Sequence, residues 1–411
     1  MTKRRVAITG IGLVTPLGST FGGFVDGLFA GASGIRLMPE WAEQVELGTK
    51  VAAPVMDFDG KVIPRQQRRS MSRVSQFATI ATGNAISASD LPEALVKNLR
   101  TGVAYGTLMG GMSAMEQYFK AVAKTGSLIS GVQSTTFLQM MSHTAAANIA
   151  MAFGIPGRLI ASCVACSAST QSIGFGYELI RDGKMDRMIC GGAEELHLGI
   201  VGCFDVLGAT SRGFADNPAG SSRPFSKDRD GLVCGEGAGT LVLEDYEQAK
   251  ARGAQIFGEI FGFYTCTDTG HMTNPSESSM ETVIRGALDD AGVGPADVAY
   301  VNAHATATEI GDVAESKAIY SVFGGETPVS SFKGNFGHLM GACGVVEVIG
   351  CLGMLARNSI APSANLTELD PRCAPLNYVP SKPQTLGNGV ILKNSFAFGG
   401  INASLVIGRG T

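Results

Sequence analysis

Charged side chains are scarce in this sequence. Only 17% of its 411 residues are Asp, Glu, Lys or Arg, whereas 45% are hydrophobic. A chain of this length and balance can bury a large core, so it does not have the composition of a disordered protein. Its formal net charge of −4 provides no general attraction to nucleic acid. We therefore expect a globular protein that does not bind DNA or RNA.

Long apolar runs are also missing. A membrane-spanning helix needs about 20 mostly apolar residues, and we find no uninterrupted run of about 18. The basic and then apolar start, MTKRRVAITGIG, continues into a glycine turn and Pro16 instead of a cleavage site. The sequence predicts a first β-strand there, and no membrane span.

The cysteines lack the pattern of a disulfide framework or a zinc site. There are nine, an odd number, between Cys163 and Cys373, and their neighbours are apolar or glycine. This favours reduced, buried thiols in a cytoplasmic protein. The sequence has no second C-x-x-C and no H-x-x-x-H to complete a metal site. A dinucleotide loop is disfavoured too, because RVAITGIGLVTPLG lacks the third glycine of that motif.

Strand-like and helix-like segments alternate, which predicts an α/β protein. The pattern restarts near residue 252, and each half has a Gly/Ala/Ser-rich helix that opens on a polar reactive side chain. These helices are CSASTQSIGFGYELIRDG and HLMGACGVVEVIGCLGML. Since such helices have poor intrinsic propensity, we expect them to be buried between other layers. We divide the chain into a half with the reactive cysteine, residues 1–251, and a half with the reactive histidines, residues 252–411.

Two cysteines lie three residues apart in ASCVACSAST, residues 161–170. They could be core residues, because free cysteine is among the most buried residue types, or a metal or redox pair. A third interpretation is a nucleophile. A strand is expected up to this point and a helix from Cys166 to about Arg181, so Cys166 would lie where free amides and the helix dipole favour a thiolate. Cys163, on the preceding strand, is expected to be its structural neighbour.

Two of the five histidines stand apart by their setting. His304 ends a strand in YVNAHATATEIGD, and His338 is expected to begin a helix in SFKGNFGHLMGACG. Lys333 lies in the same loop as His338. Strand ends and loop-to-helix turns are where α/β enzymes place their chemistry. These three residues are therefore candidates for a site, although a lone histidine is most often structural.

Six blocks of sequence, in order, resemble the condensing enzymes of the thiolase superfamily, most closely ketosynthases of the β-ketoacyl-[acyl-carrier-protein] synthase II type. They are VAITGIGLVTPLG, ACSAS, SSRPFSKDRDGLVCGEGAGTLVLEDYEQAKARGA, YVNAHATAT, KGNFGHLMGACGVVE and NSFAFGGINASL. The resemblance covers essentially the whole chain. It implies a thiolase-like fold in which two duplicated α/β halves form an α-β-α-β-α core. It also implies an acyltransferase of a fatty-acid, type II polyketide or aryl polyene pathway.

The resemblance implies roles for individual residues. Cys166 matches the acyl-accepting cysteine, His304 and His338 the two catalytic histidines, and Lys333 the nearby lysine. The backbone N–H groups of Cys166 and Phe398 match the oxyanion hole. Contacts to the substrate are implied for Thr306, Thr308, Phe398 and Met109.

The implied reaction is a decarboxylative condensation. The Cys166 thiolate accepts an acyl chain, and a malonyl thioester then loses CO₂ to give an enolate. Neutral His304 and His338 donate hydrogen bonds to the enolate oxygen, where charge develops. Lys333 is expected to order the loop, through Glu315. The resemblance implies no metal or organic cofactor, because the substrates are carried on the phosphopantetheine of acyl carrier protein.

The resemblance further implies a dimer, either of identical chains or with a chain-length-factor-like homologue. Three other functions stay open. The first is a non-catalytic chain-length-determining subunit, against which the presence of Cys166, His304, His338 and Lys333 argues. The second is a non-decarboxylating thiolase, which typically uses a second cysteine instead of two histidines. The third is a binding protein with an inactive site.

The sequence departs from the family pattern near the site. VACSAS has Ser169 where a glycine is usual, HATAT has Ala305 and Ala307, and AFGG has Ala397. A Cβ in place of glycine stiffens a loop. We expect a reshaped pocket and a non-standard acyl substrate, such as an unsaturated polyene, with Ala168 and Ser169 contributing to this choice.

A basic segment between Gly60 and Ser89 contains no acidic residue. It could be a solvated helix face, or it could dock the acidic carrier protein, as the resemblance implies for this region and for Arg212. A nucleic-acid site is disfavoured because the segment is short and the chain is net acidic. The basic residues are Lys61, Arg65, Arg68, Arg69 and Arg73, and the docking residues are expected to be Arg65, Arg68, Arg69 and Arg212.

Overall fold

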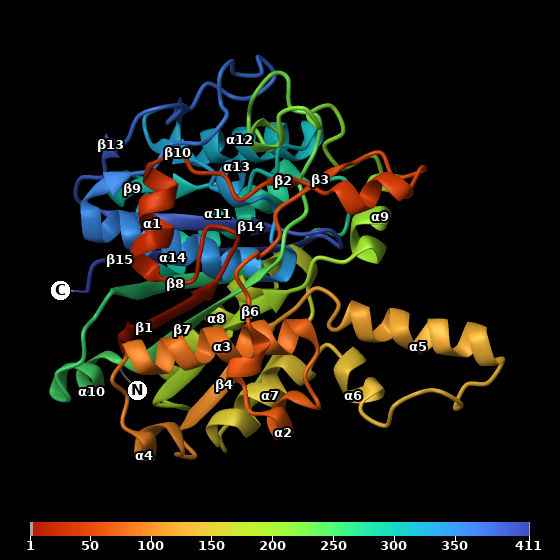
Figure 1. The fold of residues 1–411 in the computed structure, drawn as a ribbon. Helices are drawn as coiled ribbons and strands as arrows, with labels where there is room; N and C mark the ends of the chain where they lie inside the picture. Colours follow the sequence, from red (N-terminus) through yellow and green to blue (C-terminus); the bar gives the residue numbers. More distant parts are fainter. Residues whose placement is uncertain (1–2, 411) are drawn as a thin grey trace.

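The computed structural model describes residues 3–410 of the chain. Its strands are β1 (Val6–Val14), β2 (Arg36–Leu37), β3 (Val51–Ala52), β4 (Thr101–Gly106), β5 (Leu159–Ser162), β6 (Arg187–Glu194), β7 (Gly237–Asp245), β8 (Gly258–Thr267), β9 (Val298–Asn302), β10 (Pro328–Ser330), β11 (Ser359–Ile360), β12 (Asn377–Tyr378), β13 (Gln384–Thr385), β14 (Val390–Phe396) and β15 (Ile401–Gly408). Eleven of them form one mixed sheet in the order β12-β10-β9-β14-β15-β8-β1-β7-β6-β4-β5 (Figure 1).

The two halves of this sheet have the same topology. The first half runs β1-β7-β6-β4-β5 and the second runs β8-β15-β14-β9-β10. In each half the first three strands pair antiparallel, and the third, fourth and fifth pair parallel. The halves join through antiparallel pairing of β1 with β8 over Val6–Ile8. This repeat is what a duplicated α/β unit produces.

Helices cover both faces of the two half-sheets. The α-helices are α1 (Phe21–Phe29), α2 (Arg65–Arg68), α3 (Arg73–Ala88), α4 (Glu93–Val96), α5 (Met112–Thr125), α6 (Thr136–Met140), α7 (Thr144–Phe153), α8 (Ala168–Arg181), α9 (Leu198–Val206), α10 (Tyr246–Ala251), α11 (Glu277–Ala291), α12 (Glu309–Phe323), α13 (Lys333–Phe336) and α14 (Cys343–Arg357). The predicted division at residues 251 and 252 falls between α10 and β8, and it stays a prediction.

The helices make three layers around the two half-sheets. α3 and α7 pack on the first half, and α11 packs on the second with α12 beside it. α8 contacts strands of both halves, and α14 packs on α8 and on strands of both halves. In Figure 1 these two helices lie at the centre of the molecule, between the outer layers. The order of layers is therefore α-β-α-β-α, and the expected fold class is confirmed.

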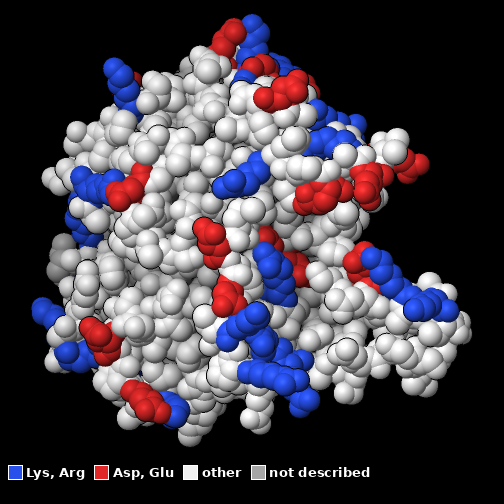
Figure 2. Space-filling model, in the orientation of Figure 1, with Lys and Arg blue, Asp and Glu red and all other residues white. Residues whose placement is uncertain are grey.

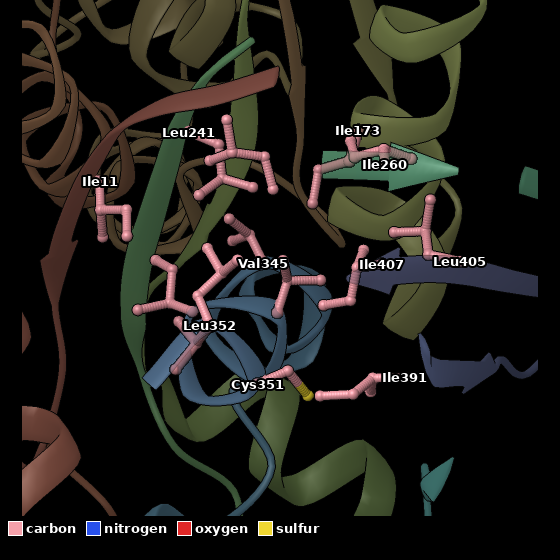
Figure 3. Packing of buried hydrophobic residues seen from close by; sticks show 14 of the residues in the cluster. Ile11, Ile173, Leu241, Ile260, Val345, Cys351, Leu352, Ile391, Leu405 and Ile407 are labelled. Atoms are coloured by element: carbon pink, nitrogen blue, oxygen red, sulfur yellow. The ribbon is translucent and has the colours of Figure 1, made fainter. Parts of the chain in front are cut away.

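Small residues let the two central helices approach their neighbours closely. A Cβ added to Gly174 of α8 would come within 2.3 Å of the Phe263 ring, and one added to Gly344 of α14 within 2.0 Å of Thr170 Oγ1. Figure 3 shows α14 surrounded by apolar side chains, with Val345 between Leu241 and Ile407. The small side chains are thus explained by packing, as expected from the poor helix propensity of these segments.

One expected boundary is wrong. The second central helix was expected to begin at His338, but α14 begins at Cys343, after a 3-10 turn over Met340–Ala342. Gly337 and Met340 have φ values of 69° and 50°, which are incompatible with a continuous helix. The segment Met340–Arg357 is long and apolar enough to cross a membrane, yet 89% of it is buried inside the protein. We interpret it as a core helix.

Packing of α3 directly on β1 supplies a test of the fold. A Cβ on Gly12 would lie 1.9 Å from Ala81 O, a backbone atom that can move only with the whole helix. We expect Gly12→Ala to lower the free energy of unfolding by about 1–3 kcal/mol in urea denaturation. Gly22→Ala is the matched control, because Gly22 has nothing within 4 Å of its added Cβ. Equal stability of the two variants would contradict the assigned packing.

Candidate active site

Cys166 lies at a sharp turn between β5 and α8. Ala165 has a φ of 48°, a left-handed conformation that residues with a Cβ adopt only when their surroundings impose it. The turn places Cys166 in the 3-10 segment Ala165–Ser167 that leads into α8, and the side chain is buried. Cys163 lies just past β5 and is exposed, as is Cys203, so the expectation that the thiols are buried is wrong for these two.

The two candidate histidines converge on Cys166. His338 Nε2 lies 3.0 Å from Cys166 Sγ. The rings of His304 and His338 are 5.4 Å apart between centroids and inclined by 82°. The sulfur and the nearest nitrogens all lie within 4.8 Å of one another. The structure therefore brings Cys166, His304 and His338 together, from the ends of β5 and β9 and from the loop before α14.

Hydrogen bonds define which nitrogen of each ring carries the proton. The Met340 amide donates to His338 Nδ1 at 3.3 Å, and Lys333 Nζ lies 3.4 Å from His304 Nδ1. Because both Nδ1 atoms accept, a neutral ring carries its proton on Nε2. The spacing of the three side chains could also suit a metal ion, but a ligand nitrogen must be unprotonated. Two Nε2–H donors fit an anionic oxygen better.

Lys333 reaches the site from α13. It is buried, and its Nζ donates to the His304 carbonyl and to Glu347 of α14. Its acidic hydrogen-bond partner is Glu347 and not Glu315, which acts on Lys333 only through its charge. Glu315 instead accepts hydrogen bonds from the His304 amide at 2.8 Å and the Ala305 amide at 2.6 Å. Burial raises the pKa of Glu315 to about 7.

Burial controls the charges of the three converging groups. It holds the pKa of His304 and of His338 well below the ordinary value, and the positive charge of Lys333 acts in the same direction. Both rings are therefore neutral near pH 7. Burial raises the pKa of Cys166 to about 11, whereas Lys333 and the backbone N–H groups of Cys166 and Phe398 lower it. The expected preference for a thiolate is thus outweighed by burial in the free protein.

The two amides that act on Cys166 are those expected to form the oxyanion hole. Phe398 lies in the AFGG turn between β14 and β15, closed by hydrogen bonds from Ala397 N to Ile401 O at 3.1 Å and from Gly400 N to Ala397 O at 3.0 Å. Gly399 and Gly400 have φ values of 88° and 73°, which favour glycine. The turn holds the Phe398 amide towards the sulfur.

A cavity of about 330 Å³ leads to these groups. Cys166, His304 and His338 line it, and so do three of the four residues expected to contact substrate: Thr306, Thr308 and Phe398. Met109 does not belong to its lining and is exposed, so the structure does not bring it to the site. The Phe398 ring packs on Phe204 of α9, with centroids 5.7 Å apart, at this cavity.

The departures from the family pattern fall in two places. Ala305 and Ala397 line the cavity, as the expected reshaped pocket requires. Ser169 is buried against α14, where its hydroxyl accepts a hydrogen bond from Val345 N at 3.1 Å. Ala168 lies against the backbone of Gly106, at the end of β4. The structure thus assigns Ala168 and Ser169 to helix packing instead of acyl-chain selection.

The expected docking residues lie in different surroundings. Arg65 and Arg69 are exposed at α2, Arg68 is partly buried, and Figure 2 shows basic side chains gathered over this part of the molecule. Arg212 is half-exposed, but its Nε lies 3.1 Å from Asp205 Oδ1. Arg73 lies 2.7 Å from Glu236 and packs on two phenylalanine rings. Among these basic residues, those at α2 have no acidic partner in the described part of the chain, whereas Arg73 and Arg212 are paired.

Sequence reasoning missed three residues of this region. Glu347 and Lys393 are charged, yet both are completely buried beside the site. Each is the single charged residue in a stretch that is otherwise uncharged and mostly apolar, GVVEVIG and VILKNSF, and that anomaly is the signal that identifies them. Phe204 has no comparable signal, because an aromatic residue in an apolar helix is usually a core residue.

Models of known protein families match both halves of the chain. The model of the β-ketoacyl synthase N-terminal domain matches residues 3–249, and the model of the C-terminal domain matches residues 257–367.

Curated relatives match over nearly their whole length. A 3-oxoacyl-[acyl-carrier-protein] synthase 2 from Synechocystis sp. is 34% identical over 98% of this chain and 98% of its own. The tetracenomycin polyketide synthase ketoacyl synthase alpha subunit from Streptomyces glaucescens is 33% identical over 99% of this chain and 97% of its own.

Solved structures of such proteins superimpose closely on this fold. A β-ketoacyl synthase from Burkholderia phymatum STM815 has a TM-score of 0.96 and 43% identity, covering 99% of this chain and 100% of its own. The ishigamide ketosynthase/chain length factor has a TM-score of 0.93 and 31% identity, over 100% of both chains. A type II PKS acyl-carrier protein in complex with its ketosynthase bound to the hexaketide has a TM-score of 0.92 and 29% identity, over 100% of both chains.

The raised pKa of Cys166 predicts a pH profile for its alkylation. Below a pKa of about 11 the reactive thiolate fraction rises with pH, so iodoacetamide should modify Cys166 faster at each step from pH 7 to pH 10. The measurement is mass spectrometry of the Cys166 peptide in a Cys163→Ala background, which removes the exposed neighbour. A rate that levels off by about pH 8 would contradict the assigned effect of burial.

Proposed function

Because the chain belongs to the β-ketoacyl synthase family, we propose that Cys166 is the acyl-accepting nucleophile and that His304 and His338 are the hydrogen-bond donors of its decarboxylative condensation. The protein is an acyltransferase of the condensing type, which elongates a fatty-acid or polyketide chain carried on acyl carrier protein. One observation carries the assignment of residues: a thiol and two Nε2–H donors meet at one cavity.

In the first step Cys166 Sγ attacks the carbonyl of an acyl thioester held on phosphopantetheine. The Cys166 and Phe398 amides, which already face the sulfur, receive the tetrahedral oxyanion. The carbon–sulfur bond to pantetheine then breaks, and the proton lost by Cys166 ends on the departing pantetheine thiol. Thr306 and Thr308, whose hydroxyls lie 3.0 Å apart in the cavity wall, are positioned to bind the pantetheine arm.

In the second step a malonyl thioester occupies the cavity beside the acylated Cys166. Its thioester oxygen accepts the Nε2–H groups of His304 and His338. Loss of CO₂ leaves an electron pair that forms an enolate at this oxygen, so the two donors stabilise charge that is absent from the ground state. Each ring needs only its Nε2–H for this role, and the lowered pKa values mean that both rings donate as neutral imidazoles.

In the third step the enolate carbon attacks the acyl-cysteine carbonyl. A carbon–carbon bond forms, the oxyanion returns to the Cys166 and Phe398 amides, and the carbon–sulfur bond to Cys166 breaks. The product is a β-ketoacyl thioester two carbons longer. We propose that no metal or organic cofactor takes part, because release of CO₂ drives the bond formation. The nine unpaired cysteines support a reducing, cytoplasmic location.

We propose that the protein works as a dimer, with an identical chain or a chain-length-factor-like homologue. β5 is an edge strand of the large sheet, and Leu159 on it is 43% exposed. The segment from α5 to α6 projects from the body of the molecule (Figure 1) and exposes Phe119, Ile129 and Phe137. Open strand edges and clustered exposed apolar side chains are typical of covered interfaces. In a mixed pair this chain would be the catalytic subunit.

The proposed roles predict a ranking of variants. Cys166→Ala should lower condensation at least about 1,000-fold, because the covalent intermediate cannot form. Cys163→Ala should stay close to wild type, since Cys163 is exposed and outside the cavity lining. His304→Ala and His338→Ala should lose malonyl decarboxylation while Cys166 still becomes acylated.

Condensation and malonyl decarboxylation assays check the ranking, and mass spectrometry of intact protein from the native host identifies the acyl chain on Cys166 by its mass. An unsaturated chain would support the polyene specificity that Ala305 and Ala397 led us to expect. Loss of activity in Cys163→Ala but not in Cys166→Ala would overturn the assignment of the nucleophile.

We propose that Arg65, Arg68 and Arg69 dock the acidic carrier protein. Their free charge at α2 supports this role, and the ion pair of Arg212 with Asp205 makes Arg212 a weaker contributor. Charges at the rim of an interface act mainly on encounter with the partner. The effect of removing them should therefore appear in KM for carrier-bound substrate.

Charge reversal at α2 tests the docking surface. Arg68→Glu and Arg69→Glu should raise KM for carrier-bound malonyl and acyl groups several-fold, with kcat unchanged. Turnover of small thioester analogues should not change, because they do not contact α2. Lys382→Glu, at an exposed position just before β13, is the control and should behave as wild type. An unchanged KM in both α2 variants would refute docking at this surface.

A further inference from the structure

Lys393 of β14 is a completely buried lysine beside the active site. Its Nζ lies 3.0 Å from Glu347 Oε2 and donates to Thr170 Oγ1 at 3.2 Å and to Ser395 Oγ. The two hydroxyls accept hydrogen bonds from the ammonium group, and the carboxylate offsets its charge at ion-pair distance. A lysine is rarely buried without such partners, so the surroundings of Lys393 form a built site for its charge.

Glu347 connects Lys393 to the candidate catalytic groups. One of its carboxylate oxygens pairs with Lys333 and the other faces Lys393. Lys333 in turn donates to the His304 carbonyl and lies 3.4 Å from His304 Nδ1. The relay from Lys393 through Glu347 and Lys333 therefore ends on the ring whose Nε2–H is assigned to the enolate oxygen.

The other two partners of Lys393 connect to Cys166 and to the oxyanion hole. Thr170 lies on α8, the helix that follows Cys166, and Ser395 lies three residues before Phe398. Their hydroxyls also bond to each other at 2.8 Å, a contact that does not need Lys393. Ser167 adds a second link, through its hydroxyl to Ile401 O at 2.8 Å. Of the three groups around the ammonium, only Glu347 Oε2 therefore depends on Lys393 as a partner.

We propose that Lys393 is a positioning residue that holds Glu347, and through it Lys333 and the His304 ring, in the geometry needed for decarboxylation. Glu347 Oε2 accepts no hydrogen bond of ordinary geometry among the described residues, and the Lys393 ammonium faces it at 3.0 Å. Without that positive charge, a buried carboxylate in this position reorients. Lys333 then follows Glu347, and His304 loses the donor that orients its ring. The inference rests on the catalytic roles proposed above for Cys166 and the two histidines.

Measuring the two half-reactions separately distinguishes a positioning role of Lys393 from a general structural role. Lys393→Met keeps the length and apolar volume of the side chain but removes its charge. We expect malonyl decarboxylation to slow by about 10- to 100-fold, the effect of a small displacement of a reacting group. Acylation of Cys166 should stay within about threefold of wild type, because Thr170 and Ser395 retain their mutual bond. A merely structural defect would slow both half-reactions together.

A double variant tests the route. If Lys393 acts through Glu347, Lys393→Met combined with Glu347→Gln should decarboxylate no more slowly than the slower single variant, whereas independent effects would multiply. Lys317→Met is the matched control, because Lys317 lies 3.0 Å from Glu277 in an exposed pair, and it should leave both half-reactions unchanged. If Lys393→Met does not fold, Lys393→Gln, which keeps donors for Thr170 and Ser395, should show the same split.

The outcomes distinguish this inference from the function on which it rests. Wild-type protein that fails to decarboxylate malonyl carrier would refute the proposed function. Wild-type protein that decarboxylates it, with a Lys393 variant that does so equally well or loses both half-reactions alike, would refute the positioning role alone. Multiplying losses in the double variant would also refute it.

Discussion

The contact between α8 and α14 in the middle layer determines the geometry of the whole site. Gly344 lies against Thr170, and the Ser169 hydroxyl accepts the Val345 amide at 3.1 Å. Because the starts of the two helices meet there, the residues just before them, Cys166 and His338, are brought to 3.0 Å from one another. A side chain larger than hydrogen at Gly344 would separate the helices and with them the sulfur and the imidazole. The glycines of these segments are therefore needed to bring the reacting groups together as well as to pack the helices.

Burial sets the electrostatic state of the site. It disfavours cationic histidines and an anionic sulfur, so the free protein holds a neutral thiol between two neutral rings. In the layer behind them, Glu347 lies between two buried lysines, Lys333 and Lys393. The amides and Nε2–H groups thus face positions where negative charge appears only during the reaction, which is the arrangement that lowers a barrier instead of tightening ground-state binding. We regard the buried charges as the scaffold that orients these donors.

The sequence predicted correctly the features that neighbouring residues form, and it failed for several features that depend on the folded backbone or on packing. The strand before Cys166, the helix after it and the closing hairpin of β14 and β15 follow from apolar runs and glycine turns that lie together in the chain. The helix expected at His338 begins at Cys343 instead, because backbone angles at Gly337 and Met340 break it. The partner of Lys333 is Glu347, not Glu315, and Met109 lies outside the cavity. The last two depend on which segments come together in the fold, and the first depends on backbone angles that no motif in the sequence indicates.

By itself the sequence determined the α/β class, the duplicated halves and the identity of the residues around the thiol. Motifs and periodic patterns lie within short stretches of the chain, so they can be identified without knowing the fold. Only the tertiary structure decided the contacts of the site: the 3.0 Å approach of His338 to Cys166, the protonated nitrogen of each ring, and the ion pairs of the two buried lysines. The physical reason is that these contacts depend on how separate elements pack, such as the start of α8 against the loop before α14 and β14 against α14. Their distances are consequences of helix packing and burial, which no local pattern of side chains encodes.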